Sequence, residues 1–137
     1  MERTLAIIKP DATERGLHSK IIQRILDEGF KIVGMKLNLL SPKAAQGFYI
    51  EHRERPFFKD LVEFMTSGPV VLLALERSDA ITHWRGVMGA TNPEQADDGT
   101  IRADIGENIE RNSVHGSDSR DSAQREVSYF FNCFELV

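Results

Sequence analysis

Cysteine is almost missing from this sequence: Cys133 is the only one in 137 residues, so no disulfide can form within the chain. A chain without disulfides suits a reducing compartment. Long apolar runs are missing as well, because the longest, Val70–Leu75, is far too short to cross a bilayer. The N-terminal residues lack the apolar stretch of a secretion signal. We therefore expect a cytoplasmic protein with no membrane partner.

Several motifs that identify common enzymes are also missing. The chain has no P-loop, no dinucleotide-binding Gly-x-Gly-x-x-Gly and no Gly-x-Ser-x-Gly nucleophile elbow. Its four histidines, at positions 18, 52, 83 and 115, are too far apart in the sequence to show the spacing of a metal site. These absences argue against the commonest nucleotide-binding, hydrolytic and metal-dependent classes.

The remaining composition is that of a folded protein. Hydrophobic residues make up 41% and charged residues 28% of the chain, and no linker, repeat or low-complexity stretch interrupts it. We expect residues 1–137 to form one domain. The net charge of −4 argues against nucleic acid as a partner, since proteins that bind the phosphate backbone usually carry a basic balance. A small anionic ligand is not excluded, because basic residues can still cluster locally.

The hydrophobic pattern predicts a sheet covered by helices. Four segments have the apolar character of strands: Thr4–Ile8, Lys31–Leu39, Val70–Leu75 and a short one from Val114. Helical spacing marks five more segments: Ser19–Gly29, Pro42–His52, Phe57–Met65, Asp79–Met88 and Asp118–Phe131. This order predicts an α/β layered fold in which the helices pack on one sheet.

Local signals predict how three of these helices begin. Ser19 is the candidate cap of the first helix, and Ser41 before Pro42 is a strong start for the second, since proline fits the first helical position. Ser78 or Asp79 is expected to cap the fourth.

Two further segments bear on the site. Tyr49 and His52 are three residues apart, so we expect them on one helical face, most simply with partly buried tips. Residues 89–112 lose periodicity, and a long irregular connection inside a compact domain is more often functional than not.

Groups that can bind an anion are scattered beside chain breakers: Lys9, Arg85, Thr91, Arg102 and Asn112. Lys9 follows the first strand, at a sheet edge where α/β proteins place ligands. Each group has an ordinary alternative, since such cations are usually solvated and Thr91 or Asn112 can be turn residues. Phe57 and Phe58 are more often core residues than parts of a site.

The segment Asn112–Asp118 carries the most information, because it places His115 directly before Gly116. An imidazole is the side chain most easily held neutral and nucleophilic near pH 7. Gly116 has no Cβ, so we expect it to leave room for a group on the ring. The alternative is a surface turn, because Gly-Ser-Asp is ordinary loop chemistry.

Five segments, taken in order, resemble the signatures of nucleoside diphosphate kinases of the bacterial type. They are Ala6-Ile7-Ile8-Lys9-Pro10-Asp11, Arg55-Pro56-Phe57-Phe58, Gly89-Ala90-Thr91-Asn92-Pro93, Gly99-Thr100-Ile101-Arg102 and Asn112-Ser113-Val114-His115-Gly116-Ser117-Asp118. The similarity extends over nearly the whole chain. It implies a ferredoxin-like βαββαβ fold, an α/β sandwich with an antiparallel sheet and added helices.

The resemblance also implies an activity and its partners. His115 would take the γ-phosphate of a nucleoside triphosphate and pass it to a nucleoside diphosphate, with ATP, GTP, GDP and other nucleotides as substrates. Mg²⁺ would come mainly with the nucleotide phosphates, without metal ligands from the protein. Family members assemble as homotetramers or homohexamers. Two alternatives stay open: a nucleotide- or DNA-binding regulator without turnover, and a phosphohistidine donor to protein partners.

Finally, the resemblance assigns roles to the other candidate residues. The matched phosphate-binding positions are Lys9, Arg85, Thr91 and Arg102, and the matched ribose-contacting positions are Lys9 and Asn112. Phe57 matches the residue on which the base stacks. Glu126 matches an acid that fixes the orientation of the histidine, with Ser117 as a relay and Tyr49 in support.

Overall fold

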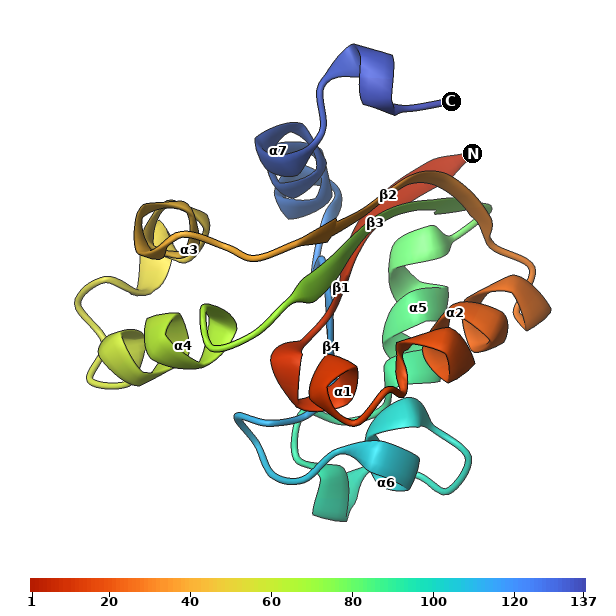
Figure 1. Cartoon of the computed structure of the whole chain (residues 1–137). Coiled ribbons are helices and arrows are strands. Elements are labelled where there is room, and N and C mark those ends of the chain that lie inside the picture. The colour runs from red at the N-terminus through yellow and green to blue at the C-terminus, as the bar shows by residue number, and fades with distance from the viewer.

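Four antiparallel strands form the sheet of the computed structural model, which describes residues 1–137 (Figure 1). They are β1 (Glu2–Ile8), β2 (Lys31–Asn38), β3 (Val70–Arg77) and β4 (Val114–Gly116), in the order β2-β3-β1-β4. Every neighbouring pair is antiparallel. The predicted ferredoxin-like sheet is therefore confirmed, with β1 and β3 as its two interior strands.

Seven α-helices surround this sheet: α1 (Pro10–Glu14), α2 (His18–Asp27), α3 (Pro42–Phe48), α4 (Phe58–Met65), α5 (Ala80–Met88), α6 (Ile101–Ile105) and α7 (Arg120–Phe130). Three short 3₁₀ turns complete the chain: Ile50–His52, Pro93–Gln95 and Cys133–Glu135. No helix combines the length and the apolar character needed to cross a membrane.

The two faces of the sheet are covered by different helices, because alternate strand residues point to opposite sides. Ala6 and Ile8 of β1 pack with α1, α2, α5 and α6, whereas Leu5 and Ile7 pack with α3, α4 and α7. All four side chains are fully buried. Figure 1 shows α2 and α5 together on one side of the sheet and α3 and α4 on the other. Both faces thus carry a core, which explains why β3 is apolar from Val70 to Leu75.

Helix starts are only partly as expected. Ser41 caps α3, since its Oγ accepts a hydrogen bond from the backbone N–H of Ala44 at 3.1 Å. Ser19 is not a cap: α2 begins one residue earlier, and its first N–H groups receive no side-chain acceptor. Asp79 occupies the residue before α5 but lies in the left-handed region, and its side chain does not cap. Glu2 from β1 accepts from the N–H of Ile81 instead, at 2.9 Å.

Two predictions about local secondary structure need correction. Tyr49 and His52 do not lie in one α-helix, because α3 ends at Phe48 and His52 lies in the following 3₁₀ turn, but both side chains border the same hollow. The segment 89–112 is not wholly irregular, because it contains α6 and the Pro93–Gln95 turn. These elements are too short to show periodicity in a sequence.

Candidate functional site

Strand β4 positions His115 on the sheet face that carries α3, α4 and α7. His115 pairs with Ile7 of β1, while its neighbours Val114 and Gly116 pair with Ile8 and Ala6. Because side chains alternate along a strand, the imidazole points to the side opposite Val114. The ring of Phe48, at the end of α3, meets it edge-on at 5.5 Å between centroids.

Helix α7 supplies the hydrogen-bond partner of the imidazole. Glu126 Oε1 lies 2.7 Å from His115 Nε2 and also accepts a hydrogen bond from Ser117 Oγ at 3.0 Å. Ser117 Oγ in turn accepts from the backbone N–H of Leu5 at 3.1 Å, which ties this network to β1. Glu126 and Ser117 are both buried. Ser117 therefore does not relay between the two groups as predicted, since Glu126 reaches the ring directly and Ser117 holds Glu126.

The surroundings favour the neutral form of the imidazole. Burial lowers the pKa of His115 below its ordinary value, and the positive charges of Lys9 and Arg102 act in the same direction against the opposing effect of Glu126. Because a carboxylate only accepts hydrogen bonds, Nε2 carries the ring proton and Nδ1 keeps its lone pair. No hydrogen bond occupies Nδ1. The ring is thus prepared to act as a nucleophile through Nδ1.

A second hydrogen-bonded group begins at the carboxyl end of β1. The Lys9 ammonium donates to Asn112 Oδ1 at 2.8 Å, and Asn112 Nδ2 donates to the backbone oxygens of Thr91 and Ile109 at 3.0 and 2.9 Å. Lys9 and Asn112 are buried, whereas Thr91 is exposed. Burial, followed by the charge of Arg102, lowers the pKa of Lys9 to about 8. The structure therefore joins three of the predicted residues, although Thr91 takes part through its backbone.

The two predicted arginines have different environments. Arg102 of α6 is buried and donates to the carbonyl oxygens of Gly89 at 3.0 Å and Val114 at 2.8 Å. Burial, with the charge of Arg85 second, lowers its pKa to about 10. Arg85 of α5 is exposed and forms neither an ion pair nor a side-chain hydrogen bond. Arg102 is fixed in place next to the backbone of β4, while Arg85 is free to meet a ligand.

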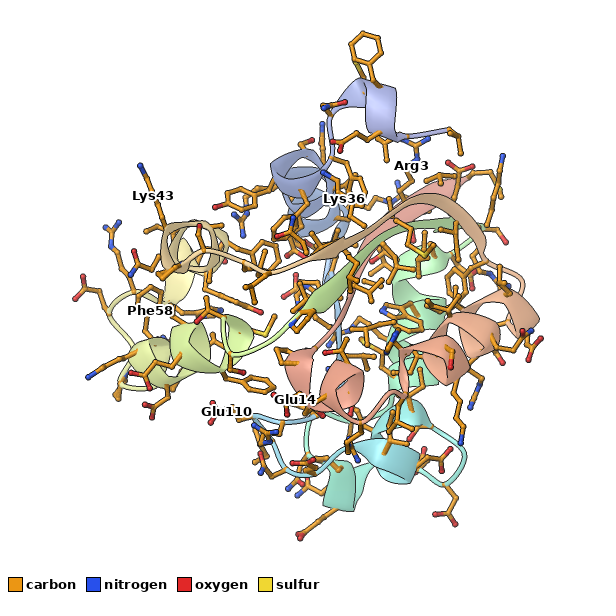
Figure 2. All side chains as sticks on the ribbon, in the orientation of Figure 1. Arg3, Glu14, Lys36, Lys43, Phe58 and Glu110 are labelled. Atoms are coloured by element: carbon orange, nitrogen blue, oxygen red, sulfur yellow. The ribbon has the colours of Figure 1, made fainter.

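Two hollows are bordered by several of these residues, but not by Arg102 or Asn112. One, of about 130 Å³, is bordered by His115, Glu126, Tyr49, His52, Phe48, Gly116, Glu51, Arg85, Asp118, Ser122 and Arg125. The other, of about 400 Å³, is bordered by Lys9, Phe57, Leu61, Thr91, Ile109 and Glu110. Figure 2 places Glu110 on the segment that passes near α1 and α4. His52 borders the first hollow and Phe57 the second, and the centroids of their rings are 5.6 Å apart. The two hollows therefore adjoin.

Phe57 and Tyr49 border different hollows. Phe57 directly precedes α4 and is 49% exposed, so it is not a core residue. Tyr49 is buried against Phe48, with ring centroids 4.8 Å apart. Burial, and then the charge of Glu126, raises the pKa of its phenol. Tyr49 thus stays protonated and able to donate at the edge of the hollow that holds His115.

Gly116 serves a different purpose from the predicted one. A Cβ at this position would lie 2.5 Å from Trp84 Cδ1 and 2.7 Å from Met88 Cε, both on α5. These atoms lie on the sheet face opposite the imidazole. Gly116 therefore lets α5 approach the strand closely and does not make room on the ring of His115.

Several residues at the hollows were not predicted as site residues, namely His52, Ile109, Glu110, Asp118 and Arg125. Ile109 is 60% exposed, and an exposed aliphatic side chain in an irregular segment gives no signal in a single sequence. Arg125 precedes Glu126 on α7, and its Nη2 donates to the backbone oxygen of Phe48 at 3.1 Å. Helical spacing alone does not show that it reaches α3.

The chain offers no cluster of three or more histidine, cysteine or acidic side chains that could hold a metal ion. Three cations, Lys9, Arg85 and Arg102, lie near the imidazole, among acidic side chains that border the two hollows: Glu51, Asp118, Glu126 and Glu110. Cations in this number suit the oxygens of phosphate groups. The arrangement can therefore hold a phosphorylated ligand beside a nucleophilic nitrogen.

Comparisons with known proteins agree along the whole chain. Residues 2–136 match the family described as nucleoside diphosphate kinase. The nucleoside diphosphate kinase of Geotalea daltonii is 60% identical over 137 residues, covering 100% of both chains. That of Geobacter sulfurreducens is 59% identical over the same length, again covering 100% of both chains.

Solved structures show the same likeness. The Aquifex aeolicus nucleoside diphosphate kinase superposes with a TM-score of 0.97 at 47% identity, covering 99% of each chain. The halophilic enzyme from Halobacterium salinarum, solved in complex with CDP, gives a TM-score of 0.96 at 43% identity, covering 99% of this chain and 91% of that one.

Proposed function

Because this chain belongs to the nucleoside diphosphate kinase family and transfers phosphoryl groups between nucleotides, we propose that His115 carries the phosphoryl group. The observation that supports this most is the 2.7 Å contact between Glu126 and Nε2, which leaves Nδ1 as the free nitrogen of a ring with a lowered pKa. The hollow around this ring also contains Arg85.

The proposed reaction has two matching halves. In the first, the Nδ1 lone pair forms a bond to the γ-phosphorus while the bond to the β–γ bridging oxygen breaks, and the nucleoside diphosphate leaves with that electron pair. In the second, the terminal oxygen of another nucleoside diphosphate attacks the phosphohistidine, and Nδ1 regains its lone pair. One site therefore serves both nucleotides in turn. Such transfers depend on alignment and on electrostatic stabilisation of the phosphoryl oxygens.

Glu126 supports both halves. The imidazole gains positive character as Nδ1 bonds to phosphorus, and the carboxylate opposite the Nε2 proton stabilises that charge. Ser117 donates to the same Oε1 and fixes the carboxylate. Phe48 limits rotation of the ring from its edge. The nucleophile thus keeps one orientation through the cycle.

The two hollows suggest how a nucleotide lies. We place the base between Phe57 and Ile109 and the ribose hydroxyls near Lys9 and Asn112. The phosphates would then lie along Lys9, Thr91, Arg85 and Arg102 toward His115. Stacking on an aromatic face tolerates every base, because each has a π-face. The CDP bound by the Halobacterium salinarum relative supports acceptance of a pyrimidine here. Broad base specificity follows.

Nucleoside diphosphate kinases need a divalent cation, and we propose Mg²⁺ for this chain. Since no cluster of protein carboxylates is available, the phosphates of the nucleotide would hold the ion. When bound, Mg²⁺ neutralises part of the phosphate charge. The contribution of the protein is then the set of cations and hydrogen-bond donors described above.

We further propose that the chain assembles as a homotetramer or homohexamer. The edge strand β2 supports association, because Met35, Leu37 and the following Leu39 are 54%, 69% and 65% exposed. Light scattering after size-exclusion chromatography distinguishes the two assemblies. A binding protein without turnover is not favoured, since the whole chain matches enzymes of this family.

Brief incubation with γ-labelled ATP tests the proposal. The wild-type protein should retain label that is lost in acid and stable in base, as expected for phosphohistidine, and added GDP should remove it as GTP. His115→Ala should not label. His83→Ala is the matched control, because His83 pairs with Glu28 between α5 and α2, away from the site. Normal turnover by His115→Ala would overturn the proposal.

A further inference from the structure

Ser113 is the one non-glycine residue of the site whose backbone lies in the left-handed region. Its φ is +76°, and Asp79 at +50° is the other non-glycine residue with positive φ in the chain. Such a conformation brings Cβ too close to the backbone and is unfavourable for serine. Ser113 is also fully buried and lies between Asn112 and β4, the strand that contains His115. Its conformation therefore needs an external constraint.

Two contacts from the start of α1 supply that constraint. The Ser113 hydroxyl donates to Asp11 Oδ2 at 2.8 Å, and the Ser113 carbonyl oxygen accepts from the backbone N–H of Lys9 at 2.9 Å. Asp11 is itself fully buried. The residue is thus held from both its side chain and its backbone by the segment that follows β1.

The Asp11 carboxylate is only partly satisfied by hydrogen bonds. Besides the hydrogen bond from Ser113, Oδ2 accepts one from Arg15 Nη2 at 3.4 Å. The other oxygen, Oδ1, is buried without any partner. A buried anion with a free oxygen is unfavourable unless positive charge lies nearby. Arg15 forms an ion pair with Oδ2, and Lys9 provides a second positive charge. Burial and the charge of Arg102 lower the pKa of Lys9, whereas the charges of Asp11 and Glu110 raise it. The carboxylate therefore has an electrostatic effect on the site besides its hydrogen bond.

We propose that Asp11 is a positioning residue for phosphoryl transfer, holding Ser113 so that Asn112 and His115 keep a fixed relation to each other. Asn112 immediately precedes Ser113, and Val114 links Ser113 to His115. The backbone N–H of Val114 also bonds to the oxygen of Asn112 at 2.9 Å, which closes a tight turn around Ser113. This inference rests on the proposed function, because it assigns nucleotide binding to Asn112 and attack to His115.

Three variants separate the backbone conformation from the hydrogen bond. Ser113→Ala removes the hydroxyl and keeps the unfavourable conformation, whereas Ser113→Gly removes the hydroxyl and makes the conformation acceptable. We expect labelling of His115 by γ-labelled ATP to slow by about tenfold in Ser113→Ala and to stay within about threefold of wild type in Ser113→Gly. Equal labelling rates for these two variants would overturn the proposal.

Asp11→Asn tests the charge, because asparagine keeps the shape and an acceptor for Ser113. The kcat/KM for a nucleotide falls as pH rises through the pKa of Lys9, since the neutral amine no longer attracts phosphate. Without the anion at position 11, the pKa of Lys9 falls further and this loss begins at lower pH. If Asp11 had only a structural role, the alkaline limb of the pH profile of kcat/KM would stay at the same pH in this variant. An alkaline limb at the wild-type pH in a folded Asp11→Asn protein would overturn the electrostatic part of the proposal.

Asp79 provides the matched control, since it has positive φ but lies at the start of α5. Asp79→Ala and Asp79→Gly should differ in thermal unfolding and label at the wild-type rate. If Asp11→Asn does not fold, the Ser113 pair still decides between the two outcomes. A wild-type protein that does not label at all contradicts the proposed function, whereas normal wild-type labelling with equal Ser113 variants contradicts this inference alone.

Discussion

Glu126 Oε1 lies 2.7 Å from Nε2 of His115, and this contact leaves Nδ1 as the ring nitrogen without a hydrogen-bond partner. The carboxylate is on α7 and the imidazole on β4, so packing of the helix on the sheet sets their distance. Since Ser117 donates to the same carboxylate oxygen, Glu126 has little freedom to turn away. The fold therefore sets the orientation of the imidazole that we propose as the nucleophile.

Replacing Glu126 by glutamine should impair the nucleophile without removing it. The glutamine amide can donate to Nε2, which favours the ring form protonated on Nδ1 and unable to attack. We expect the labelling rate to fall by on the order of a hundredfold, measured by rapid-quench phosphorylation with γ-labelled ATP. Glu135→Gln is the control, because it removes a carboxylate that pairs with Lys36 near the C-terminus. Unchanged labelling in Glu126→Gln would show that orientation by this carboxylate is unnecessary.

The pH profile of kcat/KM should have two limbs. Below the pKa of His115, which burial holds under its ordinary value of 6.5, the protonated ring cannot attack, so the rate falls as pH falls. Above the pKa of Lys9, lowered by burial to about 8, a phosphate-binding charge is lost and the rate falls again. Steady-state kinetics across this range measures both limbs. An acidic limb centred above pH 6.5 would contradict the assignment to His115.

The two arginines should separate catalysis from stability. Arg85→Met should lower kcat/KM by on the order of a hundredfold with unchanged thermal unfolding, because the exposed guanidinium has no partner within the protein. Arg102→Met should lower both quantities, since the carbonyls of Gly89 and Val114 lose their donors at a cost of about 1–3 kcal/mol. Calorimetry measures the thermal unfolding of both variants, and steady-state kinetics measures their kcat/KM. Equal stability losses in the two variants would contradict this division.

Phe57→Ala should weaken binding of every nucleotide alike. Loss of a stacking face typically costs about 1–3 kcal/mol per base, so we expect KM to rise by about tenfold for ADP, GDP and CDP. Phe134→Ala is the control, because that ring is 94% exposed in the C-terminal turn and away from both hollows. A rise confined to one base would indicate specific hydrogen bonding in place of stacking.

The sequence could predict the sheet because its signal is local. Val70–Leu75 is apolar at every position, and the structure places it in an interior strand with a core on each face. The start of α3 was equally readable, because Ser41 before Pro42 combines a cap with a residue suited to the first turn. Helices α1 and α6 have only 5 residues each, too few to show a helical period.

The site could be predicted only as a set of residues, because their contacts depend on tertiary packing. Glu126 reaches Nε2 directly because α7 packs on β1, the strand that pairs with β4. The role of Gly116 depends on which face of β4 it occupies, and only the position of Trp84 on α5 reveals it. Ile109 gave no signal, since its importance comes from its place in the same hollow as Phe57.

The most direct test of the account is to locate the phosphate during turnover. Wild-type protein mixed with excess ATP and quenched at neutral or alkaline pH should show, by intact mass spectrometry, one added phosphoryl group per chain. Peptide fragmentation should place it on His115, and phosphorus NMR should identify the Nδ1 isomer that the Glu126 contact predicts. Addition of a nucleoside diphosphate should remove it within the time of one turnover. Phosphate on any other residue, or turnover without a phosphorylated intermediate, would contradict the account.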